Sequence, residues 1–235
     1  MKTYDAYDDR SQSAHRVPGY ARTFMRTPNA ALIERPLTLT ERTGPLGTSP
    51  LGTSPLALDR DLAAVRADLT RRTPDGPRAQ GPLIVVRGRV VDQDGKPVGG
   101  ALVEVWQANA SGKYMHEDDA FDAPLDPAFA GSGRIVADAE GRFELTTIKP
   151  GPYRAAPGSW RAPHIHFSVL GPSWMDRMVT QMHFPGEPLN SFDMILNAVG
   201  DARARSRLIA RALPPEQESG DALTFEHTII LRGHG

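Results

Sequence analysis

Two histidines with the right spacing could bind a metal ion together. They are His164 and His166, in the segment APHIHF. The run HIHFSVL is typical of a β-strand, and side chains two positions apart in a strand project from the same face. The two imidazoles could therefore converge on one ion. The same spacing also occurs in strands that simply expose two histidines to solvent, so the pair alone does not decide between these alternatives.

Two tyrosines outside the expected strands are further possible ligands. Tyr114 lies in the loop sequence GKYMHEDD, and Tyr153 lies in the turn-rich sequence KPGPYRAAPG. The chain contains no cysteine, which excludes disulfides, thiolate zinc sites, iron–sulfur clusters and a cysteine nucleophile. Any metal would need imidazole, carboxylate or phenolate ligands. On its own, Tyr153 is more simply explained as an aromatic side chain that packs against loop prolines.

The composition excludes several classes of partner. The formal net charge of the 235 residues is -1 at pH 7, and lysines and arginines are scattered along the chain. No basic stripe of the kind that binds a phosphate backbone is present, so nucleic acid is not an expected partner. No run of about 18 apolar residues occurs, and the N-terminal sequence is polar where a secretion signal needs an apolar core. We expect a soluble, cytoplasmic protein that does not associate with membranes.

The elements that must position the candidate ligands are mainly β-strands. LIVVRGRVVD, the turn DGKPVGG and ALVEVWQA together predict a β-hairpin that begins at Leu83. Further strands are expected at 141–148, 164–170, 177–184 and 223–232. This number of short strands predicts an all-β fold, a β-sandwich core of mixed or antiparallel strands. A short helix near the C-terminus is expected over 201–212, because prolines at 214 and 215 follow it.

The first 80 residues differ in character from the rest of the chain. They are rich in proline, serine, threonine and arginine and lack sustained periodicity, apart from a short helical pattern from residue 58 to about residue 70. The pentapeptide LGTSP occurs twice in tandem, at 46–50 and 51–55, as expected of a duplicated loop. We expect an extended N-terminal arm over 1–80, which wraps a partner or the site, and a β-sandwich domain over 81–235.

Four longer motifs occur in one order along the chain. They are GRVVDQDGKPVGGALVEVWQANASGKYMHEDD, LDPAFAGSGR, TIKPGPY and SWRAPHIHF. Together they resemble the intradiol ring-cleavage dioxygenases, and within that family the iron-binding β chains of the protocatechuate 3,4-dioxygenases. The resemblance implies a catalytic domain that uses one Fe(III) per chain and O2 to open the ring of protocatechuate (3,4-dihydroxybenzoate) or a related catechol, giving 3-carboxy-cis,cis-muconate or its analogue. The iron ligands that it implies are Tyr114, Tyr153, His164 and His166.

The resemblance also implies roles for residues around the iron. Tyr114 matches the ligand that the catechol displaces, and Arg161 matches an arginine whose permanent charge stabilises negative charge on the substrate ring. Gln181 matches a glutamine that lies behind the ligands. Tyr20 and Arg26, in PGYARTFMRTP, match arm residues near the substrate carboxylate. Without the resemblance, Arg161 fits a surface salt bridge, Gln181 a solvent-facing strand position, and the arm residues a structural contact with a partner subunit.

Two departures from the family pattern leave the substrate open. Ala155 stands where a tryptophan is usual and His183 where a tyrosine is usual, so we expect a larger or reshaped pocket. Another catechol, such as hydroxyquinol, is therefore an alternative to protocatechuate. A non-catalytic β-sandwich subunit is a second alternative, because GRVVDQDGKPVGGALVEVW alone also resembles transthyretin-like modules. The family pattern further implies a related α chain in a hetero-oligomer, or else a homo-oligomer.

Overall fold

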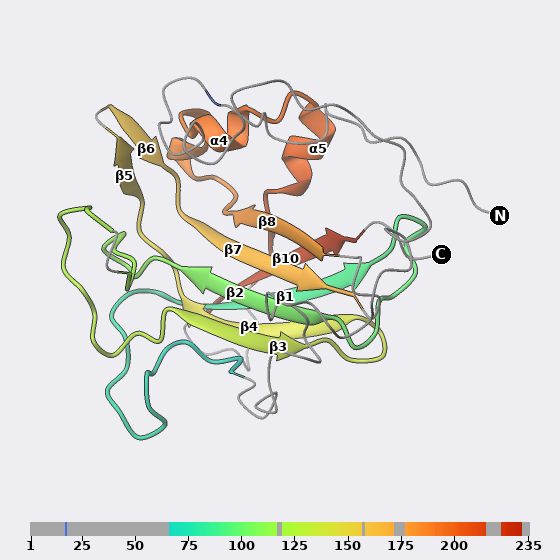
Figure 1. The fold of residues 1–235 in the computed structure, drawn as a ribbon, viewed down its shortest axis with the longest axis horizontal. Helices are drawn as coiled ribbons and strands as arrows, with labels where there is room; N and C mark the ends of the chain where they lie inside the picture. Colours follow the sequence, from blue (N-terminus) through green and yellow to red (C-terminus); the bar gives the residue numbers. More distant parts are fainter. Residues whose placement is uncertain are drawn as a thin grey trace, which may run out of the picture.

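The described residues of the computed structural model form two stacked β-sheets and a two-stranded ribbon (Figure 1). These residues are Val17 and 66–116, 119–156, 158–171, 177–214 and 222–231. The strand order of the first sheet is β4 (Arg142–Ile148), β1 (Leu83–Val91), β10 (Leu223–Ile230) and β9 (Arg211–Ala212). The order of the second is β3 (Ser132–Val136), β2 (Leu102–Gln107), β7 (His164–Leu170) and β8 (Arg177–His183). The ribbon pairs β5 (Tyr153–Ala156) with β6 (Ser159–Arg161).

Strand pairing makes this a mixed sandwich. β1 runs parallel to β10, and the remaining pairs of named strands are antiparallel. The predicted strands at 141–148, 164–170, 177–184 and 223–232 correspond to β4, β7, β8 and β10. The all-β sandwich expected from the sequence is therefore confirmed.

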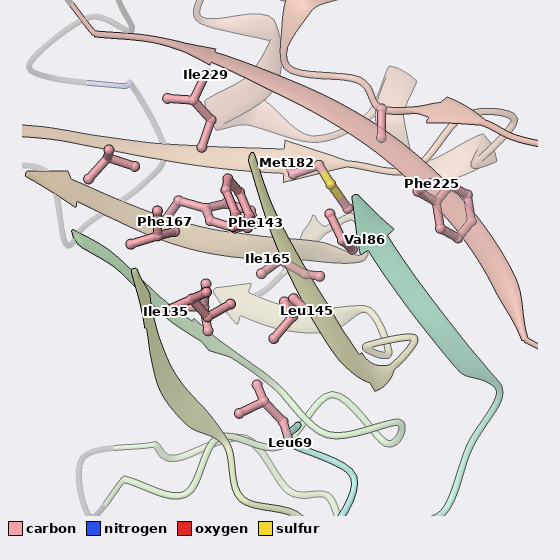
Figure 2. Close-up of a cluster of buried hydrophobic side chains, with 14 of the residues drawn as sticks. Leu69, Val86, Ile135, Phe143, Leu145, Ile165, Phe167, Met182, Phe225 and Ile229 are labelled. Carbon is pink, nitrogen blue, oxygen red and sulfur yellow. The ribbon is translucent and has the colours of Figure 1, made fainter. Parts of the chain in front are cut away.

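Apolar side chains from both sheets meet in one core (Figure 2). In β1, more and less buried residues alternate, so that Val86 and its inward neighbours face the opposite sheet. Phe143 of β4 packs against Phe167 of β7, with ring centroids 6.0 Å apart. Gly88 of β1 makes room for Phe143, because a Cβ there would overlap the phenyl ring. Burying one such aliphatic or aromatic side chain contributes about 1.5–3 kcal/mol, and this core fixes the backbone of β7, which carries both candidate histidines.

The predicted hairpin of β1 and β2 is wrong. β1 pairs with β4 and β10, whereas β2 pairs with β3 and β7 in the other sheet. The predicted turn does form: the Gly95 amide donates to the Asp92 carbonyl oxygen, and the Val98 amide donates to that of Val90. The chain then crosses to the second sheet. Both strands have apolar faces, and these faces are buried against each other across the sandwich instead of lying side by side in one sheet.

The helices within the described residues are short and lie on the β8 side of the molecule (Figure 1). They are the 3-10 helix η2 (Pro188–Ser191), α4 (Met194–Asn197) and α5 (Ala202–Arg207). The helix predicted over 201–212 is therefore present only in part. Asp201 caps it, but the His183 amide bonds to the Leu208 carbonyl oxygen and residues 211–212 form β9, so strand pairing takes over the backbone groups. No helix within the described part of the chain is long and apolar enough to cross a membrane.

The helix predicted from residue 58 to about residue 70 is wrong at its C-terminal end. Residues 66–69 are not helical, and the Leu69 amide donates to the Thr146 carbonyl oxygen at the edge of β4. Leu69 is fully buried in the core (Figure 2), so tertiary burial outweighs the local helical pattern. Residues 58–65, the LGTSP repeat, Tyr20 and Arg26 lie outside the described residues, and the arm stays a prediction.

Candidate metal centre

Four aromatic side chains form a closed ring of contacts. Their ring centroids are separated by 5.4 Å between Tyr114 and Tyr153, 5.7 Å between Tyr153 and His164, 4.7 Å between His164 and His166, and 6.2 Å between His166 and Tyr114. Tyr114 comes from the loop after β2, Tyr153 begins β5, and the histidines lie on β7. The structure thus brings together all four ligand candidates.

The two histidines direct the same ring atom toward each other, with their Nε2 atoms 3.1 Å apart. The Nδ1 of His164 lies 2.7 Å from the Ala162 carbonyl oxygen, so Nδ1 donates its hydrogen there and Nε2 keeps its lone pair. Two ring nitrogens this close need a proton or a cation between them. Burial, followed by the nearby Arg161 charge, lowers the pKa of His164 well below its usual value and keeps the ring neutral, which is the form that binds metals.

A close backbone approach holds the Tyr114 loop against Tyr153. Gly112 has a φ of 82°, a conformation that glycine adopts without strain. A Cβ at Gly112 would also overlap the carbonyl oxygen of Pro152, directly before Tyr153. Beyond the turn, the Asp119 carboxylate accepts a hydrogen bond of 2.8 Å from the Tyr114 amide. These contacts place the Tyr114 hydroxyl in a buried position beside Tyr153.

Arg161 lies next to this cluster and is almost fully buried. Its Nη1 is 3.5 Å from the Tyr153 hydroxyl, and its Nη2 donates a 2.6 Å hydrogen bond to Oε1 of Gln181. Its Nε donates to both carboxylate oxygens of Asp193, at 3.1 and 2.9 Å. The surface salt bridge considered for Arg161 is therefore wrong, because the charge is directed into the cluster. Gln181 is half-buried and contacts Arg161 instead of facing only solvent.

Two neighbours of the cluster were missed on sequence grounds. Trp106 of β2 stacks on His166, with ring centroids 4.8 Å apart and planes 6° from parallel. Asp193 caps α4 and binds Arg161. A possible signal for Asp193 was its place before the apolar run MIL, which is typical of a helix N-cap. Trp106 had no such signal, because it continues the ordinary strand pattern of LVEVWQ.

The two positions that depart from the family pattern both lie close to the candidate ligands. His183 is buried, and its ring centroid is 5.5 Å from that of His164. Burial lowers the pKa of His183 to about 4, although the Asp193 charge opposes this, so the ring is neutral at neutral pH. Ala155 is half-buried and lies in β5, two residues after Tyr153. His183 thus contacts a ligand candidate, whereas Ala155 is near the centre through its place in β5.

The donor atoms suit a hard cation. Within the described ranges, no cluster of three or more histidine, cysteine, aspartate or glutamate side chains could hold a metal. The donors that the contact ring offers are two phenol oxygens and two imidazole nitrogens. Phenolate oxygens are hard, charged donors, and imidazole completes a mixed oxygen and nitrogen set that suits ferric iron. The residues present therefore fit a non-haem ferric ion.

Comparisons with known proteins assign this fold and centre to a family. A family model described as Dioxygenase matches residues 53–233. The chain is also 43% identical over 225 residues to the protocatechuate 3,4-dioxygenase beta chain of Burkholderia cepacia, covering 95% of this chain and 91% of that one. This chain belongs to the intradiol dioxygenase family. The family consists of ring-cleaving oxidoreductases that use non-haem iron.

Other intradiol dioxygenases match over shorter stretches. The protocatechuate 3,4-dioxygenase alpha chain of Pseudomonas putida is 34% identical over 161 residues, covering 68% of this chain and 76% of that one. Catechol 1,2-dioxygenase 2 of Acinetobacter lwoffii is 36% identical over 121 residues, which is 42% of its length. The structure of 3-chlorocatechol 1,2-dioxygenase from Rhodococcus opacus 1CP superimposes with a TM-score of 0.55 at 27% identity, over 70% of this chain and 64% of that one. The chain thus spans nearly all of a β-chain relative but less than two thirds of the catechol and chlorocatechol relatives.

Proposed function

We propose that this intradiol dioxygenase is the iron-bearing subunit of an enzyme that opens protocatechuate, or a closely related catechol, between its two hydroxyl-bearing carbons. Both atoms of O2 enter the product, which for protocatechuate is 3-carboxy-cis,cis-muconate. The reaction balances without a separate reductant, because catechol and O2 together contain every atom of the product. The observation that carries the proposal is the closed contact ring of two tyrosines and two histidines, with the histidine Nε2 atoms 3.1 Å apart.

The ligands in this proposal are Tyr114, Tyr153, His164 and His166, holding one Fe(III) per chain. A nearby ferric charge lowers a phenol pKa from its usual value of about 10, so that both tyrosines are phenolates at neutral pH. When bound, the ferric ion supplies the chemistry that makes a chelated catecholate reactive toward O2. The protein supplies the pre-arranged donors, and the core behind β7 keeps them in place.

Arg161 has two tasks in this proposal. Its permanent charge stabilises negative charge that develops on the bound ring. The guanidinium also lies 3.5 Å from the Tyr153 hydroxyl, so its positive charge would stabilise a Tyr153 phenolate that is not bound to the metal. The phenolate oxygen of Tyr153 can then accept a proton from an arriving catechol hydroxyl. This contact favours Tyr153 over the candidate from the sequence, Tyr114, as the ligand that the catechol displaces. Gln181 keeps Arg161 in this orientation through the bond to Nη2.

The substrate's ring substituents would be selected by two groups of residues. Tyr20 and Arg26, on an N-terminal arm over 1–80, would bind a benzoate-type carboxylate of a substrate that the sandwich domain over 81–235 holds. Ala155 and His183 would shape the space next to the ligands. The small side chain at 155 leaves room for a ring substituent, which keeps hydroxyquinol and substituted protocatechuates among the substrates to be tested.

A second, related chain belongs to the proposal. Matches to both a beta chain and an alpha chain of protocatechuate 3,4-dioxygenases support a hetero-oligomer with an α-like partner. Co-expression with a candidate partner, followed by measurement of the assembly mass, distinguishes this arrangement from a homo-oligomer. A stable, active homo-oligomer would remove the partner from the proposal and leave the chemistry intact.

Turnover with isotope-labelled O2 tests the reaction itself. The iron-loaded protein, alone and with a candidate partner, is given protocatechuate, catechol and hydroxyquinol, and O2 uptake and product mass are measured. Both labelled atoms should appear in a cis,cis-muconate, and Tyr153→Phe and His164→Ala should lose iron and activity together. An iron-replete protein that consumes no O2 with any catechol, or that cleaves the ring outside the two hydroxyl-bearing carbons, would overturn the proposal.

A further inference from the structure

Asp193 lies behind the candidate centre, in a part of the chain that carries none of the candidate ligands. It stands between η2 and α4, and its side chain has no solvent exposure. Its partner Arg161 is 3% exposed, so the ion pair is shut off from water. A buried carboxylate without full compensation is costly, which makes its complete set of contacts informative.

The carboxylate of Asp193 binds two parts of the chain at once, the start of α4 and the segment that leads into β7. Oδ1 accepts from the amides of Ile195 and Leu196, both at 3.0 Å, and so caps α4. Oδ2 accepts from Arg161 Nε and from the Ala162 amide, both at 2.9 Å. One oxygen is thus mainly occupied by the helix and the other by the segment that leads into β7.

The contact with Arg161 determines where the rest of that side chain points. A guanidinium is planar, so anchoring Nε and Nη2 fixes the direction of Nη1. Asp193 anchors Nε and Gln181 anchors Nη2, which leaves Nη1 3.5 Å from the Tyr153 hydroxyl. Without Asp193, the long side chain of Arg161 would lose the contact that selects this orientation.

The contact with Ala162 reaches a second candidate ligand. Asp193 holds the Ala162 amide, and the carbonyl oxygen of the same residue accepts from Nδ1 of His164 at 2.7 Å. That bond decides which nitrogen of His164 carries the hydrogen and which presents a lone pair. The carboxylate therefore acts on a tyrosine through Arg161 and on a histidine through a backbone unit.

We propose that Asp193 is a positioning residue for the ring-cleavage reaction, which orients Arg161 toward Tyr153 and fixes the backbone that orients His164. The inference rests on the proposed function. The proposed role differs from that of an ion pair that only stabilises the fold. A purely structural Asp193 would affect folding and leave the electronic environment of Tyr153 unchanged.

Asp193→Asn is the most selective test, because the side-chain amide retains one oxygen to cap α4. Its NH2 group would replace Oδ2 and would meet two donors, Arg161 Nε and the Ala162 amide, so both Oδ2 contacts toward the site are lost and only the 3.1 Å contact from Nε to Oδ1 remains. Asp201→Asn is the matched control. Asp201 caps α5 by accepting from the Ala204 amide, and asparagine caps a helix about as well as aspartate.

The experiment compares wild type, Asp193→Asn, Asp201→Asn, Arg161→Leu and the Asp193→Asn/Arg161→Leu double variant. Turnover is measured together with the visible tyrosinate-to-iron absorption band and the melting temperature. We expect Asp193→Asn to lower kcat by about 10-fold or more with little change in KM, since a positioned charge acts mainly on charge that develops after binding. The absorption band should move to longer wavelength, as in Arg161→Leu, because a phenolate that loses its cation gives up electron density more readily. Asp201→Asn should change neither kcat nor the position of the absorption band.

The double variant distinguishes positioning from a general loss of structure. In the Arg161→Leu background, Asp193→Asn should lower kcat by a clearly smaller factor than in wild type, because the route through Arg161 is already absent and only the route through Ala162 and His164 remains. Equal losses in both backgrounds, or an unshifted band in Asp193→Asn, would overturn the proposal. If Asp193→Asn does not fold, Asp193→Glu, which keeps the charge but displaces it, should fold and show the same band shift and kcat loss; a wild-type band and rate there would also overturn the proposal. An inactive wild type would instead refute the proposed function, and this inference with it.

Discussion

Protonation of His227 should make the fold unstable in mild acid. His227 lies on β10, is 4% exposed, and packs on Phe167 with ring centroids 6.0 Å apart and planes 30° from parallel. Burial, with a smaller contribution from His183, lowers the pKa of His227 from 6.5 to about 4. Between these two values, the unfolded chain binds the extra proton and the folded chain does not. The free energy of unfolding should therefore fall as the pH drops below about 6.5 and should reach its full loss below about pH 4.

The size of this loss follows from the two pKa values. The complete penalty is roughly 3 kcal/mol, and about 2 kcal/mol of it should already be present at pH 5. His227→Phe keeps a ring on Phe167 and removes the titrating group. Urea unfolding of wild type and variant at pH 8, 6.5, 5 and 4.5 gives the difference between their unfolding free energies, in which other titrating groups cancel. Between pH 8 and pH 5, the unfolding free energy of wild type should fall by about 2 kcal/mol more than that of His227→Phe. Equal pH dependence of the two unfolding free energies would refute the assignment of a buried, neutral His227.

Three further predictions test how the fold supports the centre. Gly112→Ala should lower the free energy of unfolding by about 1–3 kcal/mol, because Gly112 has a positive φ and the new methyl group overlaps Pro152. Gly112→Ala also displaces the Tyr114 loop, so its iron content per chain should be lower than that of Gly88→Ala when the two variants are compared at the same folded fraction. Gly88→Ala should lower the melting temperature strongly, since the new methyl group overlaps the ring of Phe143, while the folded fraction keeps wild-type iron content and absorption; loss of iron without loss of fold would contradict this. Tyr153→Phe should lower iron affinity and remove part of the visible tyrosinate-to-iron band, and a variant with an unchanged spectrum would show that Tyr153 is not a ligand.

The sequence was most informative where local patterns and burial agree. Residues 164–170 are predicted as a strand and form β7 with the same bounds, because HIHFSVL contains the strand-favouring residues Ile165, Phe167 and Val169 and is buried along nearly its whole length. β3, β5, β6 and β9 were not predicted, since runs as short as SWR or RA have too few residues to show a period. The pairing of β1 and β2 was wrong because a good turn predicts only a local reversal and cannot show which sheet the next strand joins.

The candidate ligands could be predicted, whereas the residues that orient them mostly could not. The ligand candidates stand in long motifs whose order along the chain is distinctive. Asp193 is 32 positions from Arg161, and nothing in either local sequence indicates their contact. Trp106 lies within an ordinary strand, and its stacking on His166 depends on which strand lies beside β2.

Strand register explains why these distant residues meet. His166 lies opposite Trp106 of β2 and Gln181 of β8, and Tyr153 lies opposite Arg161 in the β5–β6 ribbon. Directly opposed side chains point to the same face, and a slip of one residue would move every side chain of a strand to the other face. A slip of β8 against β7 would thus withdraw Gln181 from Arg161, although no ligand candidate would change. The buried core that fixes these registers is therefore part of the catalytic apparatus in the proposed reaction, since it decides which neutral and charged groups surround the ligands.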